Sequence, residues 1–222
     1  MLTLVIDTST PAVIAGVCEV TAERVEVRGT AQVVDGRGHG ERLAPMIETA
    51  LGEAGVRPTD LSAVVAGLGP GPFTGLRVGL ATAASMSHAL GVPAYGVCSL
   101  DALGLELAEA VDGEVLAVTD ARRKEVYWGR YGAGGERLDG PRVDKPAELT
   151  ASLAGVAAVA GDGAHLYPQV FTSIRDEPRY PPVAAMARLA ADRVRAKAPG
   201  EVLTPLYLRR PDVHVDGKRQ RI

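Results

Sequence analysis

Apolar and polar positions at the start of the chain follow the pattern of β-strands. Residues 2–7 alternate until an acid and hydroxyls end the run, and 12–20 and 23–34 predict two further strands. A glycine-rich break follows, and apolar side chains then recur at helical spacing over residues 41–54. The first quarter therefore predicts a strand, a hairpin with its partner strand, and a helix.

The middle of the chain predicts strands that alternate with helices. Residues 61–67 form a continuous apolar run, which is typical of a strand buried on both faces. A glycine- and proline-rich loop follows. We then expect a helix over 74–90 with Thr74 as its N-cap, a strand over 94–97, and a helix over 99–110 capped by Ser99. This order favours a parallel or mixed sheet covered by helices.

The second half repeats the order of strands followed by helix. Strands are predicted over 115–119, 125–131 and 156–160, with 136–143 pairing back and a helix over 182–198. Because both halves begin with strands and continue with α/β units, we expect two related lobes. The expected boundaries are an N-terminal lobe at 1–100, a C-terminal lobe at 101–200, and a segment at 201–222 that returns toward the first lobe.

Composition narrows the class of protein. The net charge is −3 over 222 residues, which is not the balance of an autonomous nucleic-acid binder. Cys18 and Cys98 form no CxxC or zinc spacing and are interpreted as buried free thiols. The start of the chain has no basic region typical of a signal peptide, and the uncharged stretch 78–100 contains too many polar residues and glycines for a membrane span. We expect a cytoplasmic protein.

Two segments could carry phosphate chemistry. Asp7 and Thr8 begin an acid–hydroxyl cluster after the first strand, which could hold a metal-bound phosphate or form an Asx/ST turn; spacing favours the turn. The loop from Gly67 contains Gly69 and Gly71 and precedes a helix N-terminus, a position where anions bind, but it matches neither a Walker loop nor GxGxxG. These four residues are the candidate cofactor contacts, and no cofactor is predicted.

Catalytic and metal-binding motifs give no support for an enzyme. The four histidines form no HxxxH or HExxH pair, and no nucleophile elbow or cysteine–base pair is present. Two stripes on predicted helices fit either the core or a subunit interface. They comprise Leu43, Met46, Ile47 and Leu51 on one helix and Gly75, Gly79 and Ala83 on the other.

Basic residues gather in two places. Arg122, Arg123 and Lys124 are consecutive and could contact phosphate or form a solvated hairpin tip. The C-terminal stretch is also basic, and it could touch RNA or be a frayed tail. Its candidate RNA contacts are Arg209, Arg210, Lys218, Arg219 and Arg221.

Seven segments together resemble the bacterial TsaB (YeaZ) family. The segment GLGPGPFTGLRVGLATA at 67–83 is the most specific, although Pro72 stands where many relatives have Ser. The others match in the family's order: VIDTST at 5–10, HGERLAPMI at 39–47, SLDALG at 99–104, TDARRKEVYWGRY at 119–131, GDGA at 161–164 and PLYLRRP at 205–211.

The resemblance implies an α/β fold of the actin/Hsp70/sugar-kinase type, with two lobes of ribonuclease-H-like mixed sheet and flanking helices. It implies a non-catalytic accessory subunit that binds and activates a TsaD-type transferase, which forms threonylcarbamoyladenosine next to the anticodon of tRNAs. The implied partners are that transferase, a TsaE-type ATPase, tRNA within the complex, and a second copy when the transferase is absent. The family places partner contacts on the helices after His39 and Thr74, and Leu43 stands where TsaD-type proteins have the second metal-binding histidine.

The alternative function is an autonomous ATP-binding enzyme of the same superfamily, such as a small kinase. Such enzymes need a DxGxT-type phosphate loop, whereas Asp7 is followed by Thr-Ser-Thr. A peptidase and a dimeric scaffold are weaker alternatives, because no nucleophile supports the former and the basic tail argues against the latter. ATP binding by the chain alone would separate the kinase from the accessory subunit.

Overall fold

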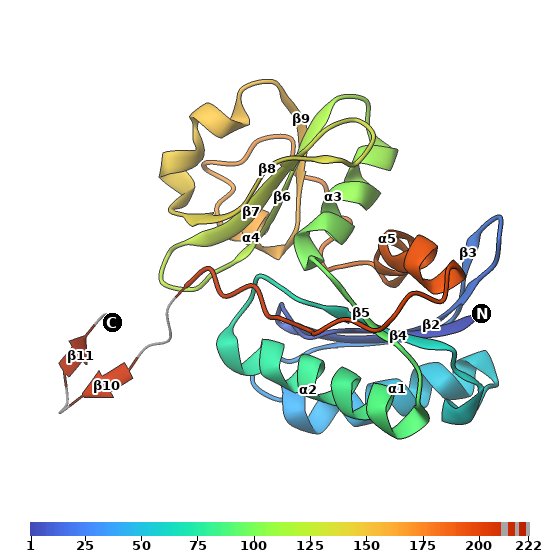
Figure 1. Cartoon of the computed structure of the whole chain (residues 1–222). Helices are drawn as coiled ribbons and strands as arrows, with labels where there is room; N and C mark the ends of the chain where they lie inside the picture. Colours follow the sequence, from blue (N-terminus) through green and yellow to red (C-terminus); the bar gives the residue numbers. More distant parts are fainter. Residues whose placement is uncertain (210–212, 216–217, 221–222) are drawn as a thin grey trace.

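The computed structural model describes residues 1–209, 213–215 and 218–220. The main body is built on two mixed β-sheets, each flanked by helices (Figure 1). A short antiparallel pair, β10 (Val213–Val215) and β11 (Lys218–Gln220), stands apart from both sheets.

The first sheet has the strand order β3-β2-β1-β4-β5. The strands pair antiparallel from β3 to β1 and parallel from β1 to β5. Their bounds are β1 Leu2–Asp7, β2 Ala12–Val20, β3 Val25–Val34, β4 Ala63–Gly67 and β5 Ala94–Val97.

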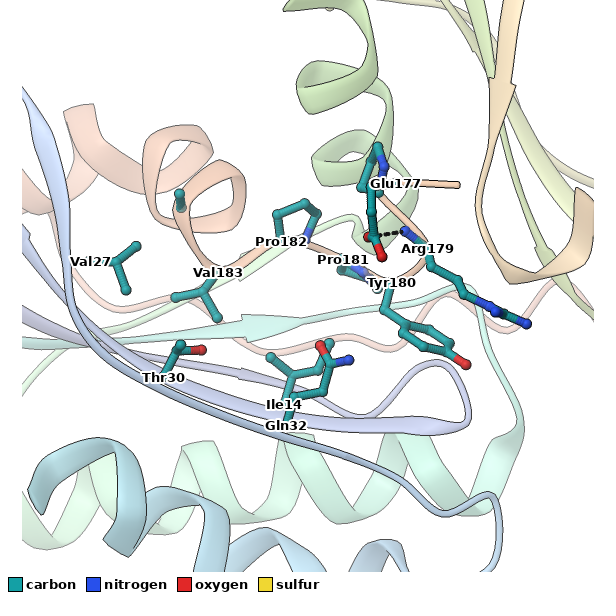
Figure 2. A pocket seen from close by; sticks show the side chains of 12 residues that line it. Ile14, Val27, Thr30, Gln32, Glu177, Arg179, Tyr180, Pro181, Pro182 and Val183 are labelled. Atoms are coloured by element: carbon teal, nitrogen blue, oxygen red, sulfur yellow. Dashed lines mark hydrogen bonds between the residues drawn. The ribbon is translucent and has the colours of Figure 1, made fainter. Parts of the chain in front are cut away.

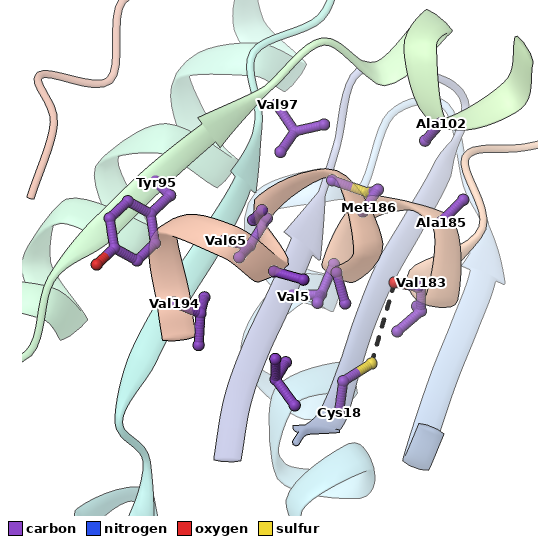
Figure 3. Close-up of a cluster of buried hydrophobic side chains, with 14 of the residues drawn as sticks. Val5, Cys18, Val65, Tyr95, Val97, Ala102, Val183, Ala185, Met186 and Val194 are labelled. Carbon is purple, nitrogen blue, oxygen red and sulfur yellow. Dashed lines mark hydrogen bonds between the residues drawn. The ribbon is translucent and has the colours of Figure 1, made fainter. Parts of the chain in front are cut away.

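Helices cover both faces of this sheet (Figure 1). Helices α1 (His39–Ala54) and α2 (Phe73–Leu90) lie on one face, where they enclose Leu4 and Ile6 of β1. Helix α5 (Val183–Arg195) lies on the other, where it packs on Val5 (Figure 3). The alternation in β1 therefore separates two buried faces rather than a buried face from a solvated one.

The second sheet has the order β8-β7-β6-β9. Helix α3 covers one face, and α4, the 3-10 turns and the segment around Phe171 cover the other. The bounds are α3 Ser99–Ala110, β6 Glu114–Asp120, β7 Val126–Tyr131, β8 Arg137–Asp144, β9 Val156–Ala160 and α4 Asp162–Leu166, with 3-10 turns at Pro146–Leu149 and Ala151–Leu153. A further 3-10 turn at Pro58–Asp60 precedes β4 of the first sheet.

The two sheets share a topology, which the order of elements in the sequence predicted. Strands β2-β1-β4 of the first sheet correspond to β7-β6-β9 of the second, because each central strand has an antiparallel hairpin partner on one side and a parallel strand on the other. The β1–β2 turn and the β6–β7 turn are therefore equivalent positions.

The chain does not divide into lobes strictly in sequence order. Helix α5 comes after the second sheet in the chain but packs on the first. From there a segment that we call the C-terminal strap (residues 196–209) runs back beside β5, where Glu201 N donates to Ala94 O and Leu206 N donates to Leu68 O. The expected lobe boundaries at residues 100 and 200 stay a prediction. Helix α5 falls between them in the sequence, but it packs on the sheet of the first lobe.

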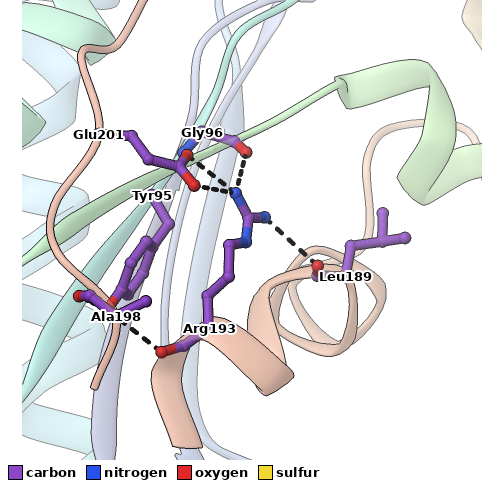
Figure 4. Close-up of polar contacts among 6 residues, drawn as sticks. All are labelled: Tyr95, Gly96, Leu189, Arg193, Ala198 and Glu201. Atoms are coloured by element: carbon purple, nitrogen blue, oxygen red, sulfur yellow. Dashed lines mark hydrogen bonds and ion pairs between the residues drawn. The ribbon is translucent and has the colours of Figure 1, made fainter. Parts of the chain in front are cut away.

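A polar cluster fixes the start of the strap (Figure 4). Arg193 on α5 donates to the carboxylate of Glu201 at 2.8 Å and to Gly96 O at 3.1 Å. The hydroxyl of Tyr95 donates to Ala198 O at 2.6 Å. These contacts tie α5, β5 and the strap together.

Most predicted elements are confirmed within two residues, but both predicted N-caps are wrong. Helix α2 begins one residue earlier with Pro72 at the cap position, and the cap of α3 is Cys98. The Ser99 hydroxyl instead bonds to Asp7 in the first lobe. Both cysteines are buried free thiols, as predicted. No helix within the described residues has the length and apolar content needed to cross a membrane.

Candidate functional site

The candidate phosphate-binding segments meet at the carboxyl end of β1. Because β1 and β4 are parallel neighbours, the turn after Asp7 and the loop after Gly67 leave the sheet at the same edge. Ligands commonly bind at this edge in open α/β sheets. The N-terminal turn of α2 packs against it.

Asp7 is fully buried and bonds only within the chain. Its Oδ1 accepts hydrogen bonds from the backbone N–H and hydroxyl of Ser9 at 2.9 and 2.7 Å, and its Oδ2 accepts one from the Ser99 hydroxyl at 2.5 Å. Burial raises the pKa of the Asp7 carboxyl, and the bonds from Ser99 and Ser9 oppose that shift. The bond from Ser9 N to Asp7 confirms the Asx-turn interpretation.

Thr8 joins the turn to helix α2. Its hydroxyl donates to Gly75 O at 2.8 Å and accepts from Gly79 N at 3.1 Å. A Cβ at Gly79 would lie 2.3 Å from Thr8 Oγ1, and one at Gly75 would lie 2.6 Å from Thr8 O. Gly75 and Gly79, which the sequence suggested for the core or a subunit interface, therefore pack against the β1–β2 turn of the same chain.

The glycine loop closes over the same turn. A Cβ at Gly71 would lie 2.2 Å from Ser9 O. Gly69 has φ +91°, a conformation that favours glycine, and its N–H donates to the Ser99 hydroxyl at 3.2 Å. The four candidate cofactor contacts, Asp7, Thr8, Gly69 and Gly71, thus meet in one junction held by hydrogen bonds and close packing, which we call the β1–α2 junction.

His39 also belongs to the β1–α2 junction. Its ring is buried, and Nε2 bonds to Thr10 O at 2.8 Å, so Nε2 carries the proton. Leu43, four residues later, is buried in the core. In the part of the chain that the structure describes, no group of three or more His, Cys, Asp or Glu is placed to hold a metal ion.

Six of the seven residues expected at a partner interface lie in the interior of this chain. Leu43, Ile47, Leu51, Gly75, Gly79 and Ala83 are buried against the chain's own sheet and turn. Of the seven residues, Met46 is the one that is partly exposed. The stripes recur at helical spacing because they form the inward faces of α1 and α2.

The outward face of α2 has an unusual composition for a solvent-exposed helix. Most such faces carry charged side chains, but no Asp or Glu occurs anywhere in α2. A signal for this face was in the sequence, since the small and polar residues also recur at helical spacing. The exposed positions are Thr74, Arg77, Ala81, Ala84, Ser85, His88 and Ala89.

A groove of about 690 Å³ runs between this face and the C-terminal strap. Val202 of the strap is 90% exposed beside it. At one end Tyr207 packs on Phe73 with ring centroids 5.0 Å apart, and the Arg77 guanidinium lies 3.7 Å from the Phe73 ring centroid. Sequence reasoning missed this groove because its two walls are more than a hundred residues apart in the chain.

The candidate RNA contacts are placed unequally. Arg209 donates to Ala121 O at 2.5 Å and pairs with Glu125 at 3.3 Å. Its side chain therefore stabilises the two ends of the β6–β7 turn. Arg210 and Arg221 lie outside the described residues, and so do the side chains of Lys218 and Arg219.

A second cavity of about 340 Å³ lies between the first sheet and the segment before α5 (Figure 2). Gln32 and Thr30 of β3 line one side of it, with Thr30 beside Val183, and Tyr180 lines the other. Asp162 interacts electrostatically with Tyr180, and burial raises the pKa of its carboxyl to about 6.

Comparison with known proteins places the chain in a family. A family model described as TsaD, tRNA N6-adenosine threonylcarbamoyltransferase, matches residues 20–178. An uncharacterized protein of Mycobacterium tuberculosis is 48% identical over 94% of this chain and 92% of its own length. The tRNA threonylcarbamoyladenosine biosynthesis protein TsaB of Bacillus subtilis is 35% identical over 43% of this chain and 41% of its own length.

Solved structures agree with the sequence relatives. YeaZ from Pseudomonas aeruginosa superposes with a TM-score of 0.75 at 28% identity and covers 93% of this chain and 99% of that one. The predicted α/β class with two mixed sheets and flanking helices is confirmed. On these grounds the chain belongs to the TsaB (YeaZ) family.

Proposed function

We propose that this chain takes part in threonylcarbamoyladenosine formation in tRNA, as an accessory subunit that binds and activates a TsaD-type transferase. Relatives in Bacillus subtilis and Escherichia coli are named as biosynthesis proteins for this modified nucleoside. The proposed partners are the transferase, a TsaE-type ATPase, and tRNA within the complex.

The observation that carries the proposal is the outward face of α2. Ala81, Ala84 and Ser85 are exposed there, and no acid interrupts the face. Small side chains let a partner's backbone approach closely, and the adjoining groove offers apolar surface from Val202, Leu203 and Pro205. A helix of a second protein fits this combination.

The β1–α2 junction supports a non-catalytic role. Asp7 and Thr8 would have to release bonds to Ser9, Ser99, Gly75 and Gly79 before they could contact a nucleotide. Breaking buried hydrogen bonds without replacement costs on the order of 1–3 kcal/mol for each group left unpaired. This cost disfavours the alternative of an autonomous ATP-binding enzyme.

The same α2 face would serve a homodimer when the transferase is absent, so the two assemblies would compete. Ala84→Arg is the variant that probes it, because Ala84 is exposed and an added side chain there leaves the core intact. Gly79→Arg is unsuitable, since any side chain at Gly79 meets Thr8.

A reconstituted reaction tests the proposal. The transferase, the TsaE-type ATPase, the enzyme that makes threonylcarbamoyl-adenylate, unmodified tRNA, threonine, bicarbonate and ATP are combined with or without this chain. Modified nucleoside should form only when the chain is present. An equal yield without the chain would refute the accessory role, and ATP turnover by the chain alone would favour the kinase-like alternative.

A further inference from the structure

The β6–β7 turn is built from three consecutive cationic residues in an unfavourable backbone conformation. Arg122, Arg123 and Lys124 have φ values of 63°, 52° and 62°, and all three are exposed. Long side chains rarely adopt this left-handed region, which glycine and asparagine occupy more readily. Strained residues that persist in a native structure are concentrated at functional sites.

Hydrogen bonds and an ion pair from neighbouring residues hold the backbone of the β6–β7 turn in place. Arg122 N donates to Asp120 Oδ1 at 2.8 Å, and Glu125 N donates to Arg122 O at 3.0 Å. Arg209 of the strap bonds to Ala121 O and pairs with Glu125. The cations are thus presented on a fixed support, which reduces the entropy that binding would cost.

A further exposed cation, Arg37, lies in the loop of the first lobe that approaches this turn. A Cβ built on Gly36 would lie 3.4 Å from Arg122 Nη2, so the turn reaches the loop before α1. Arg37 is exposed in that loop.

Two carboxylates beside these cations already form ion pairs. Asp35 pairs with Arg42 at 3.2 Å and Asp120 with Arg122 at 3.5 Å. Among the described residues, neither Arg37 nor Lys124 forms an ion pair with a carboxylate. Lys124 on the turn and Arg37 on the facing loop are therefore available to an anion, although Glu41 at the start of α1 balances the charge of the loop.

We propose that the cationic turn Arg122–Lys124, together with Arg37, binds the phosphate backbone of tRNA when the chain is in its complex with the transferase. Guanidinium groups match phosphate oxygens in geometry and charge. The chain as a whole is acidic, so its overall charge does not attract RNA and the attraction depends on local cationic patches such as this one. The inference rests on the proposed function, since the tRNA reaches the turn only within that complex.

Unmodified tRNA binding to the assembled complex tests the inference, with Kd measured by fluorescence anisotropy over a range of salt concentrations. The variant Arg122→Asn/Arg123→Asn/Lys124→Gly removes the charge and supplies residues that tolerate positive φ. We expect Kd at 150 mM salt to rise about tenfold or more, and the salt dependence of log Kd to become shallower by about two. The melting temperature should stay equal or rise, because strain is relieved.

Two controls make the result decisive. Arg24→Gln/Arg28→Gln/Arg57→Gln removes the same charge from exposed positions elsewhere on the first lobe and should leave Kd nearly unchanged. Lys124→Glu changes one exposed side chain, so it serves if the triple variant does not fold, and it should weaken binding as well. An unchanged Kd and salt slope in the turn variants would overturn the inference. Failure of the wild-type chain to join the transferase would instead refute the proposed function.

Discussion

The β1–β2 and β6–β7 turns occupy equivalent places in two related sheets, yet they differ in almost every physical respect. The first turn begins at Asp7, carries small hydroxyl side chains, and is buried under α2. The second begins at Asp120, carries three exposed cations, and has left-handed backbone at each of them. The same topology thus supports one closed turn and one open turn.

The packing of the helix that follows each parallel strand accounts for this difference. In the first lobe the glycines of α2 let the helix approach until the turn's polar groups are satisfied by the chain itself. In the second lobe no long helix follows β9 in the equivalent position, since α4 is only five residues long. The second turn therefore stays exposed to solvent.

The largest expected effect comes from disturbing the closed turn. Gly71→Ala would place a methyl group 2.2 Å from Ser9 O, an atom of a packed backbone that cannot move aside. We expect a loss of about 3 kcal/mol or more in the free energy of unfolding, measured by urea denaturation.

Gly52→Ala is the matched control for that measurement. A Cβ at Gly52 meets nothing within 4 Å, and the residue lies inside α1. Stability should rise by up to about 1 kcal/mol, because alanine is the better helix former. Similar stabilities for the two variants would contradict the close packing of the first turn.

A smaller effect is expected at Asp162, beside the open turn. Its pKa is raised to about 6 by burial, above the value of an unfolded aspartate near 3.9. The protonated carboxyl is favoured in the folded protein, so its contribution is complete below about pH 4 and is lost as pH rises through 6. Relative to Asp162→Asn, the wild type should lose about 2 kcal/mol of stability between pH 4 and 7.

Denaturation at several pH values measures this loss. Asp192→Asn serves as the control, because the Asp192 side chain is fully exposed. If the free energies of unfolding of the wild type and Asp162→Asn change in parallel with pH, the pKa of Asp162 is not raised and the prediction is wrong.

The smallest effect is the release of strain in the second turn. Lys124→Gly removes a side chain from a residue at φ 62° and should stabilise the protein by about 1 kcal/mol. Lys145→Gly, at an exposed residue with φ −75°, should destabilise it by roughly 0.5 kcal/mol or more. Thermal unfolding measures both, and a loss of stability at Lys124→Gly would argue against backbone strain in this turn.

The order of the elements was predictable from the sequence because hydrophobic periodicity depends on local spacing. The strands and the helices from 41–54 to 182–198 appear within two or three residues of their predicted ends. The packing of α5 on the first sheet was not predictable. It depends on contacts between residues that are far apart in the chain, such as Val183 and Gly16.

The site was predicted less well than the fold. The spacing of Gly75, Gly79 and Ala83 correctly indicated a close approach, but it carried no information about what approaches. The answer, Thr8, depends on how β1 and α2 are juxtaposed. Ser99 was misassigned as a cap for the same reason, because its partner Asp7 comes from the other end of the lobe.

The central claim is that the chain activates a transferase through the outward face of α2, and the most direct test is a titration. The initial rate of threonylcarbamoyl transfer is measured at fixed transferase while the chain is added. The wild type should raise the rate from near zero to a plateau, and Ala84→Arg should reach the same plateau only at concentrations at least tenfold higher. A rate that does not depend on the chain, or one that appears without the transferase, would contradict the account.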